Sequence, residues 1–385
     1  MSKKFFVPLW VFGSVLLFLY SFTQVDLSLT LSRASIFQTI EKSFQYVGWF
    51  NRPLSTYLYI GVFVILFALY LWTLILVSKK KLNRKTVWIG IIVITGILTL
   101  SYNAFSYDLF NYIFDAKIVT HYHLNPYIHK ALDFSGDPML SFMRWTHRVY
   151  PYGPLWLVLT VPISFIGHNI FFLTFYLFKI MIASFFILCV WSIEKIGKSL
   201  KLDNVLYPVV AFAFNPYVLS ESLVSAHNDI VMMGLCLYAT SLLIDKQALK
   251  GSVMYILSAA LKFATGLSFI GFLVLLVIRK TKFLIPVSLI LMIGAVVLAS
   301  LRTNFQPWYL LYAFPFAALL IKRRAIRFPY YIFTIASIAY YIPFLYNGNW
   351  DPPIPMTLNY IILGATALSI VIFLVYFPHS KKETG

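Results

Sequence analysis

The segment "SYDLFNYIFDAKIVTHYHLNPY" at 106–127 contains polar side chains at a spacing that could do chemistry. Asp108, Asn111 and Asp115 follow one another at intervals of three and four residues, so on a helix they share one face. Ser106 could cap that helix and leave Asp108 in its first turn, near the positive end of the helix dipole. A carboxylate held there could act as a general base toward a hydroxyl group. The alternative is an amphipathic helix whose acids are only solvated.

The histidines and cysteines of the chain offer weaker signals for a metal. His121 and His123 are two residues apart, so they do not share a helical face, and we expect them to lie in a loop. The chain has 2 cysteines, Cys189 and Cys236, and both lie in apolar segments without metal-ligand spacing or a disulfide framework. We therefore assign no metal ligands from the sequence.

Two arginines stand in the segment "FMRWTHRVYPYGPLW" at 142–156. Arg144 and Arg148 are four residues apart and could form a fork for a phosphate beside lipid headgroups. The alternative is plain headgroup contact, or a salt bridge to Asp133 or Asp137.

A second polar cluster follows in "FNPYVLSESLVSAHNDIVMMG" at 214–234. A helix is expected to end near Asn215-Pro216, before Glu221, His227, Asn228 and Asp229. Polar groups between apolar helices are costly unless they face water or one another, and His227 could exchange hydrogen bonds with a substrate. The alternative is a polar cap, with Asn228 or Asp229 at the N-terminus of the next helix.

Cations and aromatic residues complete the set of candidates. Lys262 in "ALKFATGL" and Arg302 in "RTNFQPWYL" are expected at helix ends, where snorkelling to headgroups is the simple explanation. Together with Arg144 and Arg148 they could bind a polyprenyl-linked phosphate. Trp308 suits an aromatic belt at the membrane surface, but also the stacking of a sugar or an isoprenoid.

The elements that must position these residues are membrane helices. Of the 385 residues, 60% are hydrophobic and only 11% are charged, so the bilayer must solvate most of the chain. We expect one integral membrane domain over 1–385, an all-α polytopic bundle of about twelve transmembrane helices. The expected spans are 5–23, 57–77, 86–105, 170–193, 204–220, 229–245, 250–264, 266–279, 283–301, 307–321, 328–346 and 357–377.

The loops between the spans orient the bundle. The net charge is +18, but the basic residues form short clusters between apolar segments, as in cytoplasmic loops, and a nucleic-acid partner is not expected. Placing these clusters inside leaves both termini cytoplasmic, and the first apolar segment is expected to be a retained helix rather than a signal peptide. Most acids and histidines then fall outside, in large loops at about 24–56 and 106–169. We interpret 153–167 as an interfacial helix broken by Pro151, Pro154 and Pro162.

The motifs also resemble a known group of enzymes. An aspartate just after an early transmembrane helix, in a long outer loop, is similar to the GT-C glycosyltransferases. More narrowly, "YDLFNYIFDAK", "HLNPY", "YPYGPLW", "FNPYVLSESLVSAHND", "ALKFATGL" and "QPWYLL" together resemble the bacterial polyprenol-phosphate-mannose-dependent α-1,6-mannosyltransferases, over about 86–320.

The resemblance implies a GT-C-like bundle whose long outer loop carries interfacial helices and the catalytic acid. A hexose, expected to be mannose, would pass with inversion from a polyprenyl-phosphate donor to a lipid-linked or cell-envelope glycan acceptor at the outer face of the cell membrane. Asp108 matches the loop aspartate of the family and would be the base. The "AHND" stretch with His227, Asn228 and Asp229, Lys262, and the stretch from Arg302 through Gln306 to Trp308 match positions near donor and acceptor.

The resemblance also suggests a role for each of the other candidate residues. Lys262 and Arg302, with Arg144 or Arg148, would meet the charge of the leaving phosphate. Asp115 or Asp229 would orient the acceptor or hold a divalent cation, and no other cofactor is expected. The alternative function is a multi-span transporter or flippase of lipid-linked saccharides, although transporters usually bind substrate near the midplane on broken helices.

Overall fold

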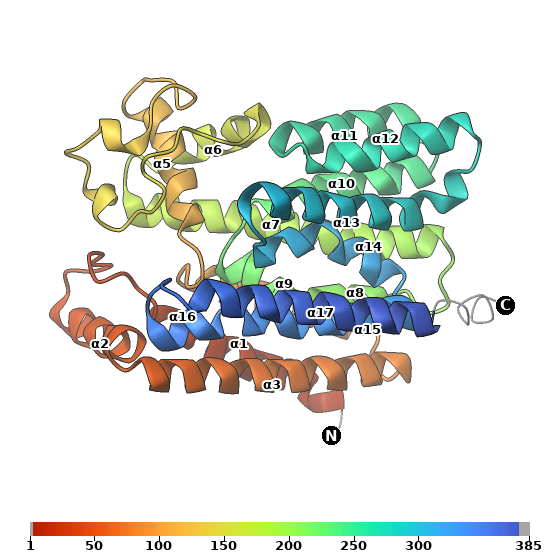
Figure 1. The fold of residues 1–385 in the computed structure, drawn as a ribbon, viewed down its shortest axis with the longest axis horizontal. Coiled ribbons are helices and arrows are strands. Elements are labelled where there is room, and N and C mark those ends of the chain that lie inside the picture. Colours follow the sequence, from red (N-terminus) through yellow and green to blue (C-terminus); the bar gives the residue numbers. More distant parts are fainter. Residues whose placement is uncertain (1–2, 377–385) are drawn as a thin grey trace.

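The chain is a bundle of helices that run along one common direction. The computed structural model describes residues 3–376, and it contains no strand in that range. Long helices lie side by side along the longest axis in Figure 1, while long loops gather at its left-hand end. The main helices are α1 (Phe6–Phe22), α2 (Ser35–Gln45), α3 (Arg52–Ser78), α4 (Arg84–Thr99), α5 (Asp108–Thr120), α6 (Pro154–Ile166), α7 (Phe171–Ser199), α8 (Leu206–Ala213), α9 (Pro216–Leu219), α10 (Asp229–Ile244), α11 (Ala248–Leu261), α12 (Ala264–Val277), α13 (Leu284–Thr303), α14 (Phe314–Leu319), α15 (Arg324–Ala339), α16 (Ile342–Asn347) and α17 (Ile354–Tyr376).

The all-α prediction is confirmed for the described residues, but only some of the twelve predicted spans are helices long and apolar enough to cross a membrane. Within the described residues, 5 helical stretches are long and apolar enough to cross a membrane, or up to 6 if one bent pair counts as a single span. They are Arg52–Ser78, Phe171–Ser199, Thr281–Thr303, Arg324–Asn347 and Ile354–Tyr376, and the bent pair is Pro216–Val224 with Asp229–Ile244. Phe6–Phe22, Ala248–Leu261 and Ala264–Val277 are apolar but shorter.

The predicted span at 204–220 is interrupted where the sequence indicated. Helix α8 ends at Ala213, and the Asn215 side chain accepts hydrogen bonds from the first backbone N–H groups of α9. The carbonyl of Ala211 accepts from the hydroxyls of Tyr70 and Tyr330, at 2.9 Å each. Because this carbonyl is released from the helical ladder, the two tyrosines fasten α3 and α15 to the interruption.

The middle of the chain forms the buried core of the bundle. Every residue from Val209 to Gly234 is buried, and helix α10 packs against α7 and α11. After α9, one π-helical turn (Ser220–Val224) ends the first arm, and the chain then bends by 111° into α10. The bend directs residues 225–228 into the protein rather than toward the surface.

Helix α6 replaces the broken interfacial helix expected at 153–167. It has 13 residues, which at 1.5 Å per residue is about 20 Å and less than the hydrocarbon thickness. Pro154 begins the helix, but Pro162 lies inside it without ending it, so the predicted break at Pro162 was wrong. In Figure 1, α5 and α6 lie together at the left-hand end.

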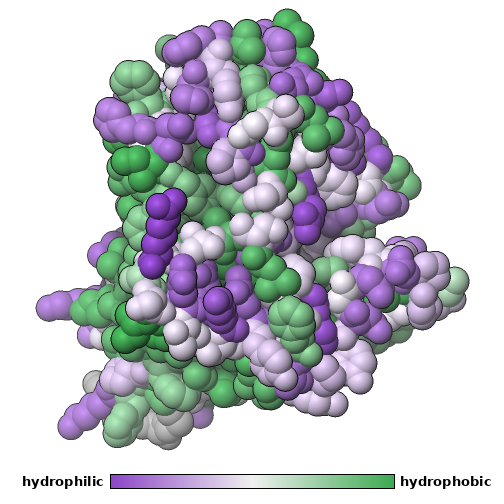
Figure 2. All heavy atoms as spheres, turned by 90° about the vertical axis from the view of Figure 1, so that its left-hand side faces the viewer, coloured by the Kyte–Doolittle hydropathy of each residue, from purple (hydrophilic) through white to green (hydrophobic). Residues whose placement is uncertain are grey.

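The two ends of the bundle differ in character. The end that carries α2, α5 and α16 lies at the left of Figure 1, opposite the C-terminal end of the described chain. Figure 2 views this end directly and shows hydrophilic side chains over much of its face, with apolar side chains along one margin. The candidate acids of α5 therefore lie at the end of the bundle that also holds the long loops.

Candidate functional site

Asp108 begins helix α5, close to where the sequence placed it. The backbone N–H of Asp108 donates to the Ser106 hydroxyl at 3.1 Å, so Ser106 serves the predicted role although Tyr107 occupies the capping position. The Asp108 side chain is 16% exposed. It is therefore an acid that a substrate hydroxyl can reach, at the positive end of a helix dipole.

His227 lies between Asp108 and a second acid. Its Nδ1 is 3.5 Å from Asp108 Oδ2, and its Nε2 is 3.2 Å from Glu221 Oε2. These are ion-pair distances, but neither nitrogen is aligned for a hydrogen bond. The imidazole ring stacks on Trp308, with 4.2 Å between the centroids. His227 thus connects Asp108 of α5 to the buried Glu221. The sequence placed His227 among polar residues but did not predict this contact.

The bend before α10 is what brings His227 inward. The His227 N–H donates to the Glu221 carbonyl at 3.1 Å, and Ala226 has a positive φ of 54°, which is unusual for a residue with a side chain. Asn228 stands at the capping position of α10 without a capping hydrogen bond, and its side-chain oxygen and nitrogen are buried without a partner within the described chain. The simple capping explanation is therefore not realised for Asn228.

Asp229 forms an ion pair with Lys262. The Lys262 Nζ donates to Asp229 Oδ1 at 2.7 Å and lies 5.4 Å from the centre of the Tyr152 ring. Asp229 is fully buried, while Lys262 is 18% exposed in its side chain. Lys262 lies in the short turn between α11 and α12, so its ammonium is directed into the cluster rather than left to snorkel.

A glycine sets the distance between Tyr152 and the turn that carries Lys262. The Gly153 N–H donates to the Leu261 carbonyl at 3.0 Å. A Cβ atom at position 153 would lie 2.1 Å from the Ala260 carbonyl oxygen, far inside contact distance. The motif "YPYGPLW" therefore has a structural reason, because only glycine lets the two backbones approach.

Asn111 and Asp115 continue the Asp108 face of α5, as predicted. The Asn111 Oδ1 atom is buried and has no partner among the described residues. Asp115 retains some exposed surface, yet the protein atoms around its carboxyl desolvate it and raise its pKa to about 8. A carboxyl that is largely protonated at neutral pH is a hydrogen-bond donor, which suits a hydroxyl partner better than a cation.

The two arginines do not form a fork on a helix. Residues 142–150 are not helical, so the spacing of four does not place Arg144 beside Arg148. Arg144 lies 3.8 Å from Asp26 and over the Tyr107 ring, and Arg148 lies over the ring of Trp145. The salt-bridge partner of Arg144 is therefore Asp26, whereas the alternatives named from the sequence were Asp133 and Asp137. Asp133 and Asp137 pair with other residues instead.

Asp133 and Asp137 lie in the loop after α5, and each has a partner in that loop or in α5. Asp133 Oδ2 lies 3.6 Å from His129 Nδ1. Asp137 accepts from the Tyr122 hydroxyl at 2.6 Å and pairs with Lys117 of α5 at 2.5 Å. Burial alone would raise the pKa of the Asp137 carboxyl, but Lys117, Tyr122 and the Met139 N–H outweigh it and hold the pKa below its usual value. The loop is fastened to α5 by this pair.

The remaining candidates lie between the end of α13 and the start of α14. Arg302 is exposed in the last turn of α13, and Tyr309 lies within its electrostatic reach. Gln306 is half-buried immediately before the turn Pro307–Tyr312, which carries Trp308. Of these three residues, Trp308 contacts a member of the site, because its ring stacks on His227. Arg302 and Gln306 precede Trp308 in the sequence by six and two residues.

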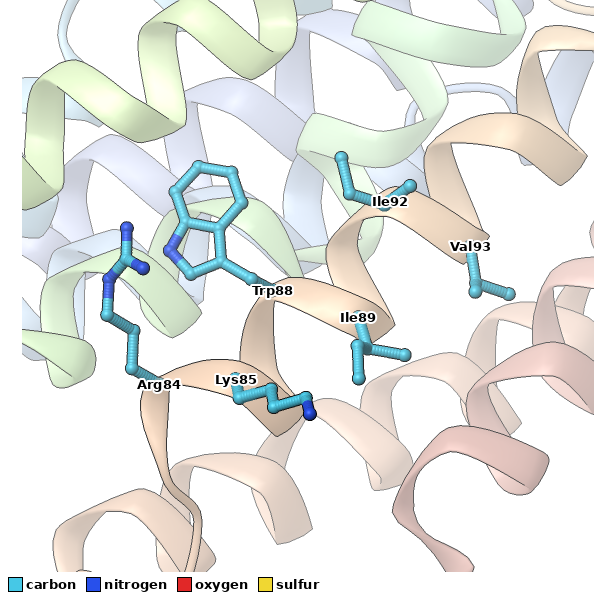
Figure 3. A pocket seen from close by; sticks show the side chains of 6 residues that line it. All are labelled: Arg84, Lys85, Trp88, Ile89, Ile92 and Val93. Atoms are coloured by element: carbon cyan, nitrogen blue, oxygen red, sulfur yellow. The ribbon is translucent and has the colours of Figure 1, made fainter.

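Two further features lie outside this cluster. Within the described residues no group of three or more His, Cys, Asp or Glu side chains could hold a metal ion. A shallow groove of about 570 Å³ follows the first turns of α4, at the opposite end of that helix from the segment that leads to Asp108. Figure 3 shows Arg84 and Trp88 on the same side of α4, and both bind the buried Glu194, so this groove is separate from the candidate site.

Sequence reasoning missed several members of the cluster. Glu221 was grouped with the polar residues of its segment but not assigned to the site, and Tyr341, which donates to Glu221 Oε1 at 2.9 Å, was not considered. Tyr152 and Gly153 stood inside a quoted motif without a role. The order of the motifs was the only available signal, because contacts between distant segments leave no trace in local spacing.

Comparison with known proteins adds one finding. The model of the family described as "Alpha-(1->6)-mannopyranosyltransferase, N-terminal domain" matches residues 9–279, which contain Asp108, His227, Asp229 and Lys262. No curated protein and no solved structure matches the chain. The match confirms the resemblance inferred from the motifs and covers well over half of the sequence. The chain belongs to the alpha-(1->6)-mannopyranosyltransferase family.

Proposed function

We propose that the protein transfers a mannosyl residue from a polyprenyl-phosphate donor to a hydroxyl of a lipid-linked or cell-envelope glycan, with inversion at the anomeric carbon. The observation that carries the proposal is Asp108, a partly exposed carboxylate at a helix N-terminus, backed by buried His227 and Glu221. Membership of a mannosyltransferase family favours this reaction over the transport of lipid-linked saccharides.

Asp108 is the base of the proposed reaction. It accepts the proton of the acceptor hydroxyl while the oxygen forms a bond to the anomeric carbon. The bond from that carbon to the phosphate oxygen breaks on the opposite face, and polyprenyl phosphate leaves with the electron pair. One attack from the face opposite the leaving group produces inversion.

Cations near the cluster are the proposed partners of the phosphate. Lys262 is held by Asp229, so its position is fixed while its partial exposure leaves an N–H free to turn toward a donor. Arg302 is exposed at the end of α13, where an anionic headgroup could reach it. Arg144 and Arg148 lie on the loop before α6 and are proposed only as outer contacts, because each already has a partner.

The acceptor is proposed to lie along the polar face of α5. Asn111 has a buried carbonyl oxygen without a partner, and Asp115 carries a proton at neutral pH, so the two offer an acceptor and a donor to sugar hydroxyls. A divalent cation at Asp115 or Asp229 is not needed in this arrangement, because Asp229 is neutralised by Lys262.

The proposed site faces the outside of the cell membrane. The loops at the end that carries α5 are rich in acids and histidines, whereas basic clusters such as 79–85 follow helices that run to the other end. This arrangement supports cytoplasmic termini and a bundle of about twelve crossings, with the short helices tilted or paired.

A transfer assay tests the base assignment. Purified protein receives a polyprenyl-phosphate mannose donor and a lipid-linked mannoside acceptor, and the anomeric configuration of the product reports inversion. Asp108→Asn is expected to lower kcat by about 10²–10⁴-fold, because the amide cannot accept the proton. Asp351→Asn is the matched control, since Asp351 is an exposed acid in the loop before α17. Full activity of Asp108→Asn overturns the assignment.

A further inference from the structure

Glu221 is a buried acid that the proposed reaction does not use. Its side chain is 1% exposed, and it lies in the π-helical turn before the bend into α10. One oxygen accepts from the Tyr341 hydroxyl at 2.9 Å, and the other lies 3.2 Å from His227 Nε2. A row of four groups therefore runs from Tyr341 through Glu221 and His227 to Asp108.

The two carboxylates beside the imidazole favour its doubly protonated form. Each ring nitrogen of His227 faces a carboxylate oxygen, Asp108 on one side and Glu221 on the other. A neutral imidazole carries a lone pair on one nitrogen, which would then face the lone pairs of a carboxylate. Only the doubly protonated ring presents N–H groups to both acids. Full burial of His227 makes a mismatch costly, because electrostatic interactions are stronger in the protein interior than in bulk solvent.

We propose that Glu221 is a positioning residue for Asp108, acting through His227. Glu221 holds His227 as an imidazolium, and the imidazolium holds the Asp108 carboxylate in place to accept the proton of the acceptor. The inference rests on the proposed function, because it assigns a role relative to the base of that reaction. It adds a residue, Glu221, that does not touch the substrate.

The reason lies in what the proton would do without Glu221. A pair made only of the partly exposed Asp108 and the buried His227 can remove both charges by moving one proton from the imidazole to the carboxylate. Asp108 would then already carry a proton and could not accept another from the acceptor. With Glu221 on the far nitrogen, that transfer would strand a second buried carboxylate, so the proton stays on His227. The proton taken up in the reaction is therefore the one that leaves the acceptor hydroxyl.

The other ionisable groups near the row do not supply this role. Asp229, two residues after His227, is paired with Lys262. Lys179 of α7 also reaches the turn that carries Glu221, but it donates to the Val224 carbonyl at 3.4 Å and to the Ser101 hydroxyl at 2.9 Å. The other neighbours are phenols, which are uncharged at neutral pH. They are Tyr59 from α3, Tyr112 from α5, Tyr152 before α6, Tyr217 from α9, Tyr309 and Tyr312 from the turn before α14, and Tyr341 before α16. Within the described part of the chain, Glu221 is the acid placed to hold the far nitrogen of His227.

The test is the pH profile of transfer by Glu221→Gln, measured as kcat/KM for the acceptor. The glutamine keeps the shape and removes the charge. The acidic limb of the profile is expected to move to higher pH by about 1 unit, so transfer falls most below neutrality and recovers as the pH rises. The KM for the donor is expected to stay within about twofold, because Glu221 does not contact it. A purely structural role would lower the activity equally at every pH.

Glu41→Gln is the matched control. Glu41 is also a buried glutamate, but it belongs to α2 and accepts from the Leu31 N–H. Its substitution is expected to leave the profile at its wild-type position. An active Glu221→Gln protein with an unshifted acidic limb overturns the inference.

Tyr341→Phe keeps the inference open to disproof if Glu221→Gln does not fold. It removes the hydrogen bond to Glu221 and is expected to move the acidic limb in the same direction by a smaller amount, whereas an unshifted limb overturns the role. Asp108→Asn distinguishes a failure of the positioning role of Glu221 from a failure of the base assignment of Asp108. If that variant is inactive while both others keep the wild-type profile, only the positioning role fails. If it is fully active, the base assignment fails and this inference with it.

Discussion

At the scale of single residues, the acids of the site differ in the partners that surround them. Asp229 has a cation beside it, and Asp137 has a cation and two hydrogen-bond donors. Asp115 has no ion-pair or hydrogen-bond partner among the described residues, and its pKa is raised to about 8 by burial. Identical side chains on one helix face, such as Asp108 and Asp115, therefore have different chemistry for reasons that spacing does not reveal.

Asp115 should make the stability of the protein depend on pH. The folded state keeps a proton on Asp115 up to about pH 8, whereas the unfolded chain loses it near the ordinary aspartate pKa of 3.8. The folded state thus binds more protons in this window, so the free energy of unfolding falls as the pH rises from about 4 to about 8. Asp115→Asn is expected to remove this slope and to raise Tm at pH 8.5 by about 3 °C, with little gain at pH 5.

Thermal unfolding of the purified protein in detergent, from pH 5 to pH 8.5, measures this difference. Asp133→Asn is the control, because Asp133 is 37% exposed in its side chain and lies in the loop after the same helix. The quantity that matters is the difference between variant and wild type at each pH, since other acids titrate in both. A difference that does not grow with pH contradicts a buried, protonated Asp115.

The residue scale also shows where sequence reasoning ends. The shared face of Asp108, Asn111 and Asp115 followed from helical spacing, and the structure has that helix. The same reasoning failed for Arg144 and Arg148, because the spacing has meaning only on a helix and that segment is a loop. The contact of Asp108 with His227 could not be predicted, because it depends on a 111° bend that no local pattern encodes.

At the scale of elements, α6 and the turn between α11 and α12 form one unit through Gly153. The Gly153 N–H donates to Leu261, the residue before Lys262, and the preceding residue Tyr152 contributes the ring over which Lys262 lies. The contact therefore sets the place of the cation relative to Asp229. Apolar periodicity predicted both helices, but the close approach between them appears in the sequence only as a glycine in a short motif.

Gly153→Ala is expected to lower transfer by about tenfold or more, because displacement of a site element by 1 Å can cost that much. The added Cβ would meet the Ala260 carbonyl at 2.1 Å, so the start of α6 must move away from Lys262. Gly136→Ala is a matched control in the preceding loop, where an added Cβ meets nothing within 4 Å. The transfer assay with both variants decides, and wild-type activity in Gly153→Ala contradicts the positioning of Lys262 by this contact.

At the scale of the whole molecule, composition predicted the helical class and the distribution of charge predicted an orientation. The interrupted segment at Asn215-Pro216 was expected from its proline, and the short helices α11 and α12 lie close to the predicted ranges 250–264 and 266–279. The ends of the bundle are well separated in Figure 1, where α3 ends and α17 begins at opposite ends. This separation allows a direct test of orientation with one label at each end.

Lys81→Cys and Asp351→Cys place a thiol in the exposed loop after α3 and in the exposed loop before α17. Their reactivity can be read against a quiet background, because Cys189 and Cys236 are fully buried. With basic loops held inside the cell, a membrane-impermeant maleimide added to intact cells is expected to label Asp351→Cys, and to label Lys81→Cys only after the membrane is permeabilised. The wild-type protein should stay unlabelled in both conditions. Labelling of Lys81→Cys in intact cells with protection of Asp351→Cys would reverse the orientation, and Asp108 would then meet its donor from the cytoplasm.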